Sequence, residues 1–156
     1  MKNIAYQHTP IGLIEITEED GKLTFLKFVK FQKYTEDASM VMQEAKWQLE
    51  AYFEGKRKSF NLPLHFDCSS LQEEIYTALQ KVPYGTTLSY QNLAILVQDK
   101  GITRAVGTAM AKNPFPIIIP CHRVLKNDGS IGNYTGAEGA KTKQWLIDHE
   151  KAITLK

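Results

Sequence analysis

The part of this sequence best suited to chemistry is Pro-Ile-Ile-Ile-Pro-Cys-His-Arg-Val, residues 116–124, in which a cysteine is followed directly by a histidine. Proline fixes φ and favours extended geometry in the residue before it, so Cys121 stands on a stiff backbone beside aliphatic side chains. A thiol attacks as the thiolate, and a neighbouring base such as His122 promotes its formation. The competing interpretation is a buried, inert cysteine beside an unrelated histidine, and this segment alone favours that interpretation.

The composition is that of an ordinary globular chain of 156 residues, 43% of them hydrophobic, with a formal net charge of +2. Two cysteines, Cys68 and Cys121, do not make a disulfide framework, which favours the reducing cytoplasm. The cysteines and histidines lack metal-binding spacing, so we expect no metal site. Membrane-spanning and export segments are also missing from the sequence. We therefore expect a cytoplasmic protein that makes no membrane contact.

The first 66 residues predict a small antiparallel sheet with one helix. Residues 12–18 alternate in part between apolar and polar side chains, and with residues 23–29 they indicate a hairpin. A helix is expected over residues 39–54 and a short edge strand over residues 60–64. This half of the chain balances acidic and basic side chains, so charge alone indicates no partner for it.

From residue 67 onward the sequence is mainly helical. Ser70 and Glu73 have the spacing of a capping box at the start of a helix. A last helix is expected over residues 140–151 and carries Glu150. This helix must pack back on the core of its own half to bury its apolar face.

Between these helices lies a helix-turn-helix pattern, with helices expected over residues 90–97 and 102–112 and a glycine in the turn. Helical hairpins are common, so the pattern alone is a weak sign of DNA binding. The second helix has mainly small side chains, and its Gly107 costs about 1 kcal/mol relative to alanine. Small side chains allow close approach either to another helix or to the minor groove of DNA, and both remain open. Residues 102–124 contain basic but no acidic side chains.

Together these segments resemble the methylated-DNA–protein-cysteine alkyltransferases, which repair O6-alkylguanine in DNA. The Pro-Cys-His-Arg-Val motif is the most specific part of the match, and the first half of the chain matches more loosely. The matching segments come in family order over about residues 67–151 and are Pro-Tyr-Gly-Thr (83–86), Ser-Tyr-Gln-Asn-Leu-Ala (89–94), Arg-Ala-Val-Gly (104–107), Asn-Pro (113–114), Ile-Pro-Cys-His-Arg-Val (119–124), Gly-Asn-Tyr-Thr-Gly (132–136) and Trp-Leu to Glu (145–150).

The resemblance implies an α+β fold with two domains. Residues 1–66 would form a ribonuclease H-like supporting domain, an antiparallel sheet plus a helix. Residues 67–156 would form a mainly helical, winged-helix-like domain, whose helix-turn-helix binds DNA and which carries out alkyl transfer.

The resemblance also implies roles for four catalytic residues. Cys121 would accept the alkyl group, activated through a water by His122, which Glu150 orients. Tyr90 would donate a proton to the departing guanine. A thioether is a poor leaving group, so each molecule would act once, without metal or organic cofactor.

The DNA partner is expected to be double-stranded and bound through its minor groove by a monomer, with cooperative binding along DNA left open. The lesion would be O6-alkylguanine, and O4-alkylthymine is left open as a second substrate. The damaged nucleotide would be flipped out of the duplex, and Arg104 would fill the space that it leaves in the base stack. The other expected DNA contacts are Tyr90, Gln91, Ala105 and Gly107. The expected substrate pocket consists of Met110, Asn113, Pro116, Val124, Tyr134, Thr135 and Gly136.

Three other functions fit parts of the sequence. A non-enzymatic lesion sensor of the same fold commonly replaces the nucleophile with tryptophan, so Cys121 argues against it. A small helix-turn-helix regulator leaves the Pro-Cys-His-Arg-Val motif and Glu150 unexplained. A Cys-His hydrolase of esters would need an oxyanion hole and would turn over.

Overall fold

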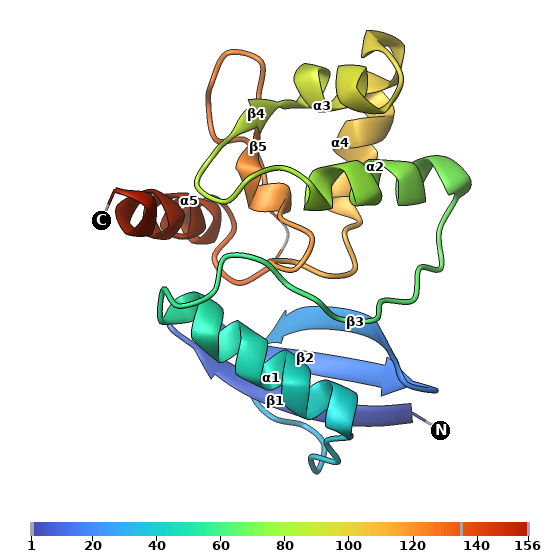
Figure 1. The fold of residues 1–156 in the computed structure, drawn as a ribbon, viewed down its shortest axis with the longest axis vertical. Coiled ribbons are helices and arrows are strands. Elements are labelled where there is room, and N and C mark those ends of the chain that lie inside the picture. Colours follow the sequence, from blue (N-terminus) through green and yellow to red (C-terminus); the bar gives the residue numbers. More distant parts are fainter. Residues whose placement is uncertain (1, 135, 156) are drawn as a thin grey trace. The chain divides into compact units, whose positions relative to one another are not determined.

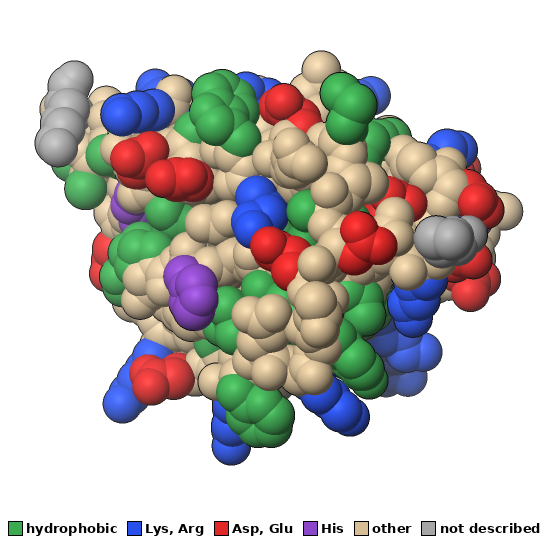
Figure 2. Space-filling model, turned by 90° about the horizontal axis from the view of Figure 1, so that it is seen from below, with side chains coloured by type: hydrophobic (Ala, Val, Ile, Leu, Met, Phe, Trp, Pro, Cys, Tyr) green, Lys and Arg blue, Asp and Glu red, His purple; other side chains and the backbone are tan. Residues whose placement is uncertain are grey.

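The computed structural model describes residues 2–134 and 136–155, which divide into two compact units. The first unit ends at Phe66 and the second begins at Asp67 (Figure 1). No helix in the described part of the chain is both long and apolar enough to cross a bilayer. On the face drawn in Figure 2, acidic and basic side chains are interspersed.

The first unit is a three-stranded antiparallel sheet with a helix packed on it. Strands β1 (Lys2–Thr9), β2 (Gly12–Glu19) and β3 (Lys22–Val29) lie in sequence order, and α1 (Met40–Phe53) packs against them. Its N-cap is Ser39, whose side chain accepts from the N–H of Met42. The largest buried side chains of this unit are Ile14, Ile16, Leu23, Leu26, Met42, Leu49 and Tyr52.

The predicted hairpin and helix of this unit are confirmed, whereas one strand was missed and another was wrong. Strand β1 escaped prediction because its apolar signal is short, with only Ala5 and Tyr6 buried. The expected edge strand over residues 60–64 is reduced to a single bridge between Leu64 and Leu23. Pro63 contributes a carbonyl but has no N–H, so it cannot continue a ladder.

The second unit is built from helices around a short parallel strand pair. Its elements are α2 (Ser70–Gln80), β4 (Leu88–Ser89), α3 (Tyr90–Val97), the 3₁₀ turn η1 (Lys100–Ile102), α4 (Thr103–Ala111), the 3₁₀ turn η2 (Cys121–Arg123), β5 (Val124–Leu125) and α5 (Ala140–Thr154). Strands β4 and β5 pair in parallel and join the start of α3 to the segment after Cys121.

The helix-turn-helix is confirmed as α3 and α4, and Ser89 caps α3 by accepting from the N–H of Asn92 at 3.0 Å. The capping box of α2 was placed one residue too late. Ser69 accepts from the N–H of Gln72 at 3.1 Å, and the Gln72 side chain accepts from the N–H of Ser69 at 3.2 Å. Two overlapping pairs had capping-box spacing, and the helix starts at the earlier one. Helix α5 also runs on to Thr154, because nothing between its predicted and actual ends breaks a helix.

Helix α4 buries one face and leaves another open. Val106 and Ala109 are fully buried, and the Ala109 carbonyl accepts from the hydroxyl of Tyr76 on α2 at 2.8 Å. Burial raises the pKa of Tyr76 to about 12, so this hydroxyl keeps its proton. Nothing lies within 4 Å of a Cβ added at Gly107. Some of the small side chains therefore serve helix packing, whereas Gly107 leaves open space beside the helix.

Candidate active site

Cys121 lies at the start of η2, directly after a buried apolar run, and is 7% exposed. Its N–H donates to the Ile119 carbonyl at 2.7 Å. Asn113 braces the preceding turn: its Nδ2 donates to the Ile119 carbonyl at 2.8 Å, and its Oδ1 accepts from the Phe115 N–H at 2.9 Å. Within this turn Ile117 has φ +77°, a costly conformation for a β-branched residue. The turn is thus strained and firmly held, and it delivers the thiol to one place.

Behind the cysteine, a buried cluster links η2 to α5. His122 Nε2 lies 2.6 Å from Glu150 Oε2. Arg123 donates to both oxygens of the same carboxylate, at 2.9 and 3.0 Å, and through Nη1 to the Val82 carbonyl at 2.7 Å. The N–H of Gly85 adds a fourth contact to Glu150, at 3.1 Å. One carboxylate therefore orients both the histidine and the arginine that follow Cys121.

The charges of this cluster define the protonation of His122. Burial alone would raise the pKa of Glu150, but His122 and Arg123 outweigh it and hold that pKa well below its usual range. Burial lowers the pKa of His122 despite the contact with Glu150, so the imidazole is neutral near pH 7. A neutral ring that donates from Nε2 to a carboxylate has its lone pair on Nδ1. No described residue hydrogen-bonds to Nδ1, which leaves it available as a base.

The Cys121 thiol is protonated at rest. Burial raises its pKa, and this outweighs the hydrogen bond from Asn113 and the positive charge of Lys143, which both lower it. Lys143 is only 1% exposed, and its Nζ lies 3.4 Å from the Asn133 carbonyl and 5.9 Å from the ring centroid of Tyr90. The site thus holds a thiol, a neutral base and a buried cation.

Lys143 was not among the residues singled out from the sequence, although a signal for it existed. It precedes Leu146 by three residues and Glu150 by seven, which places all three on one face of a helix. The structure buries that face of α5. A lysine at this spacing from Glu150, a predicted site residue, could have been singled out for the same reason.

Replacing Lys143 with methionine is expected to raise the pKa of Cys121 further, because the nearby positive charge favours the thiolate. The measurement is the pH dependence of Cys121 alkylation by iodoacetamide in a Cys68→Ser background. Lys141→Met, at an exposed position on the same helix, is the matched control. An unchanged pKa in Lys143→Met would contradict this role for the lysine.

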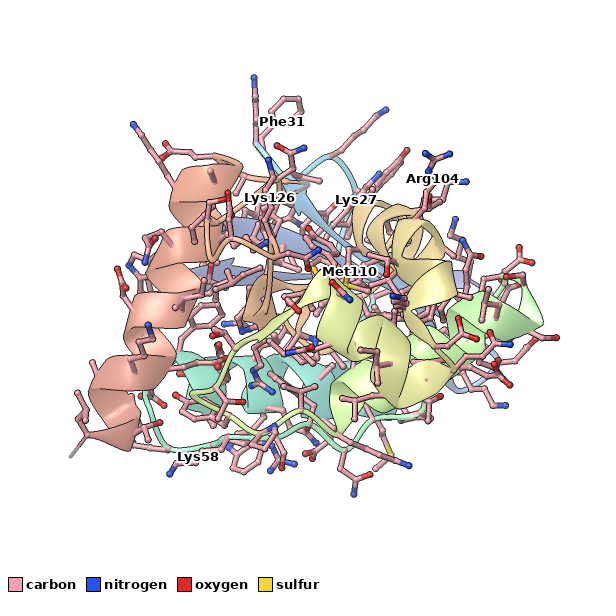
Figure 3. All side chains as sticks on the ribbon, turned by 90° about the horizontal axis from the view of Figure 1, so that it is seen from above. Lys27, Phe31, Lys58, Arg104, Met110 and Lys126 are labelled. Atoms are coloured by element: carbon pink, nitrogen blue, oxygen red, sulfur yellow. The ribbon has the colours of Figure 1, made fainter. Side chains whose placement is uncertain are left out.

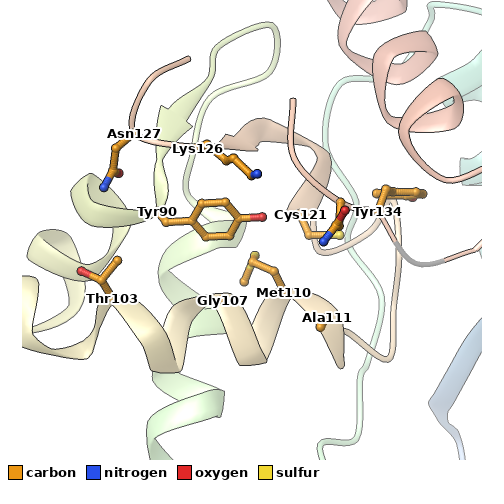
Figure 4. Close-up of a pocket in the computed structure, with 10 residues that line it drawn as sticks. Tyr90, Thr103, Gly107, Met110, Ala111, Cys121, Lys126, Asn127 and Tyr134 are labelled. Carbon is orange, nitrogen blue, oxygen red and sulfur yellow. The ribbon is translucent and has the colours of Figure 1, made fainter. Parts of the chain in front are cut away.

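A cavity of about 450 Å³ opens beside Cys121, within the size range of pockets that hold small ligands. Figure 4 shows the hydroxyl of Tyr90 pointing across it toward Cys121. Burial, and next the nearby Cys121, raise the pKa of this hydroxyl, so it is a proton donor at neutral pH. The lining residues are Tyr90, Thr103, Gly107, Met110, Ala111, Cys121, Lys126, Asn127, Asn133 and Tyr134.

Half of these lining residues were expected at the site, namely Tyr90, Gly107, Met110, Cys121 and Tyr134. The other five were not among the predicted site residues, although Asn133 lies in the matching segment 132–136, because their place depends on how α4 and the chain after β5 fold around the cysteine. The cavity therefore combines motif residues with residues that only the tertiary structure identifies.

The other predicted site residues that the structure describes do not line the cavity. Pro116 and Val124 are buried, and Gly136 is exposed with φ +114°. Ala105 is half-buried on α4, and Gln91 donates its N–H to Asn127 Oδ1 at 3.3 Å. Thr135 lies outside the described residues.

Arg104 does not line the cavity. Its side chain is exposed and projects outward from α4, as Figure 3 shows. It is therefore placed to contact a molecule bound on the outer side of α4.

Comparison with known proteins gives a consistent result over the whole chain. Residues 70–152 match the model of the 6-O-methylguanine DNA methyltransferase DNA-binding domain, and residues 3–66 match its ribonuclease-like domain. Methylated-DNA–protein-cysteine methyltransferase of Methanosarcina barkeri is 38% identical over 149 residues, covering 92% of this chain and 93% of the relative. The constitutive enzyme of Bacillus subtilis is 34% identical over 153 residues, covering 92% of each.

Solved structures agree with the sequence comparison. The O6-methylguanine methyltransferase of Mycobacterium tuberculosis matches with a TM-score of 0.85 and 32% identity over 97% of this chain and 94% of that one. The structure of the same protein in complex with DNA matches with a TM-score of 0.84 and 33% identity over 95% of this chain and 92% of that one.

Proposed function

Because the chain belongs to the 6-O-methylguanine DNA methyltransferase family, we propose that it repairs O6-alkylguanine in DNA by moving the alkyl group to its own Cys121. The observation that carries the proposal is a cavity in which the Cys121 thiol faces the Tyr90 hydroxyl, with the His122–Glu150 pair behind the thiol. We assign DNA binding and alkyl transfer to residues 67–156 and a supporting role to residues 1–66.

The reaction is a displacement at the alkyl carbon. The bond from Cys121 Sγ to that carbon forms as the bond from the carbon to guanine O6 breaks. The thiol proton passes to His122 Nδ1 through a water, and the resulting imidazolium is stabilised by Glu150. The electron pair of the broken bond moves into the guanine ring, which takes a proton from Tyr90 and leaves as neutral guanine.

Access to the lesion requires the nucleotide to leave the base stack, because O6 lies inside the duplex. DNA is the partner of this chain, and the open side of α4 is the surface that we assign to it. Gly107 leaves room for close approach to a minor groove, and the exposed Arg104 is suited to fill the vacated stack. Such contacts go to the backbone and to groove shape, which suits a protein that must find lesions in any sequence.

The product is a thioether at Cys121, which does not regenerate the thiol. Since no other thiol lines the cavity among the described residues, nothing there would take the alkyl group from Cys121, and we expect one event per molecule. This chemistry requires only one copy of the chain and one of its thiols, that of Cys121. The need for a reduced Cys121 also favours action in the cytoplasm.

The test of this function is a titration of excess duplex containing one O6-methylguanine with limiting protein. We expect lesion loss to stop when one lesion has disappeared per protein molecule, and Cys121→Ala to remove none. Continued turnover would support a hydrolase, and tight binding without lesion loss would support a sensor. Either outcome would overturn the proposal.

A further inference from the structure

Lys126 lies at the solvent end of the catalytic cavity, in the turn that follows β5. Its N–H donates to the Ser130 carbonyl at 3.0 Å, and its carbonyl accepts from the Gly129 N–H at 2.9 Å, so its backbone is held. The side chain is exposed, whereas Cys121 at the inner end of the cavity is buried. Figure 4 shows Lys126 extending over the cavity beside the hydroxyl of Tyr90.

The stem of Lys126 is guided by Gly132. A Cβ added at Gly132 would lie 3.4 Å from Lys126 Cγ, 3.7 Å from Lys126 Cε and 3.7 Å from the Tyr90 hydroxyl. The bare glycine thus lets the lysine stem and the tyrosine hydroxyl converge. Gly132 also has φ +75°, where any side chain would be strained.

The described residues that line the cavity include a positively charged side chain and no negatively charged one. Among the described residues that line it, Lys126 is the one with a charged side chain. Lys126 takes part in none of the salt bridges found among the described residues, although its charge, after the hydrogen bonds from Ser130, helps to lower the pKa of Asp128. The nearest acid in sequence, Asp128, accepts from the N–H and the hydroxyl of Ser130 at 2.9 and 2.7 Å, which keeps its carboxylate within the turn.

A second donor stands next to this cation. Asn127 also lines the cavity, and its Oδ1 accepts from the Gln91 N–H at 3.3 Å. The amide of Asn127 is therefore oriented with its NH₂ group as the remaining polar end. An ammonium and an amide donor at one mouth suit an anionic oxygen cluster, whereas an uncharged purine inside the cavity needs no cation there.

We propose that Lys126, with Asn127 beside it, binds a phosphate of the extruded nucleotide at the mouth of the cavity. This inference rests on the proposed function, because it takes the occupant to be a nucleotide within DNA. A phosphodiester flanks every nucleotide in DNA, so when the base reaches Cys121 its phosphates remain at the solvent end. The contact would hold the nucleotide outside the stack whatever the surrounding sequence.

The test compares Lys126→Met with the natural protein on two substrates, a duplex containing one O6-methylguanine and the nucleoside O6-methyl-2′-deoxyguanosine, which has no phosphate. We expect the ratio of the second-order rate constants, duplex over nucleoside, to fall about tenfold. The salt dependence of duplex binding should also become shallower by about one counterion. Lys151→Met, an equal charge change at an exposed position outside the cavity lining, should leave the ratio and the slope unchanged.

An unchanged ratio would overturn the inference. If Lys126 acted through Tyr90 rather than on phosphate, both substrates would slow together and the ratio would stay constant. An equal fall of the ratio in Lys151→Met would also contradict the inference, because the loss of any positive charge from the protein would then explain the result. Failure of the natural protein to methylate Cys121 with the duplex would instead refute the proposed function.

Discussion

Glu150→Gln is expected to lower the free energy of unfolding by about 3 to 5 kcal/mol and the rate of alkyl transfer by about 100-fold or more. Glu150 is buried, and its carboxylate receives hydrogen bonds from His122, Arg123 and Gly85. A neutral amide leaves the buried Arg123 charge without its counterion and no longer stabilises an imidazolium at His122. Chemical denaturation measures the first effect, and single-turnover methyl transfer at a temperature where the variant is folded measures the second.

Glu74→Gln, at an exposed position on α2, is the matched control and should change neither quantity. The pH dependence provides an independent check. The pKa of Glu150 is held below that of the unfolded chain, so its contribution is complete above about pH 4.5 and declines as the pH falls further. The stability difference between natural protein and Glu150→Gln should therefore narrow in acid. A constant difference down to pH 3 would contradict the assigned charges.

Tyr90→Phe is expected to slow alkyl transfer by about 100-fold, because guanine then leaves without a proton donor. Its hydroxyl points toward Cys121, and burial raises its pKa, so the proton is present at neutral pH. Binding of the lesion duplex should persist, since the ring remains. The reactivity of Cys121 toward iodoacetamide should also persist, because that reaction has no guanine leaving group.

The control is Tyr34→Phe, which removes an exposed hydroxyl from the first unit. Transfer at the natural rate in Tyr90→Phe would exclude this tyrosine as the donor. Loss of iodoacetamide reactivity along with transfer would show that the tyrosine acts on the thiol instead.

The elements that position the site were largely predictable because each has a local signal. Ser89 marks the start of α3, and the small residues mark α4. The pair of Cys121 and His122 is recognisable by adjacency and by the prolines around it. Glu150, far along the chain, was identified only through a family resemblance, and the structure places it 2.6 Å from His122.

What the sequence could not supply is which side chains converge from separate elements. Arg123 lies in the motif, but its paired hydrogen bonds to Glu150 depend on how α5 packs. Lys126 and Asn127 lie in a polar turn, and polar turns are common on protein surfaces whether or not they bind a ligand. They reach the cavity because β5 pairs with β4 and Asn127 bonds to the start of α3. Strand pairing and packing of this kind leave no periodic pattern in the sequence.

The most direct test of the central claim is peptide mass spectrometry after mixing the protein with a duplex containing one O6-methylguanine. The chain provides its own comparison, since Cys68 is exposed and Cys121 is buried. We predict one added methyl group on the peptide that contains Cys121, none on the peptide that contains Cys68, and a yield equal to the lesion lost. Methyl on Cys68, or lesion loss without any gain of mass by the protein, would contradict the claim that Cys121 is the acceptor.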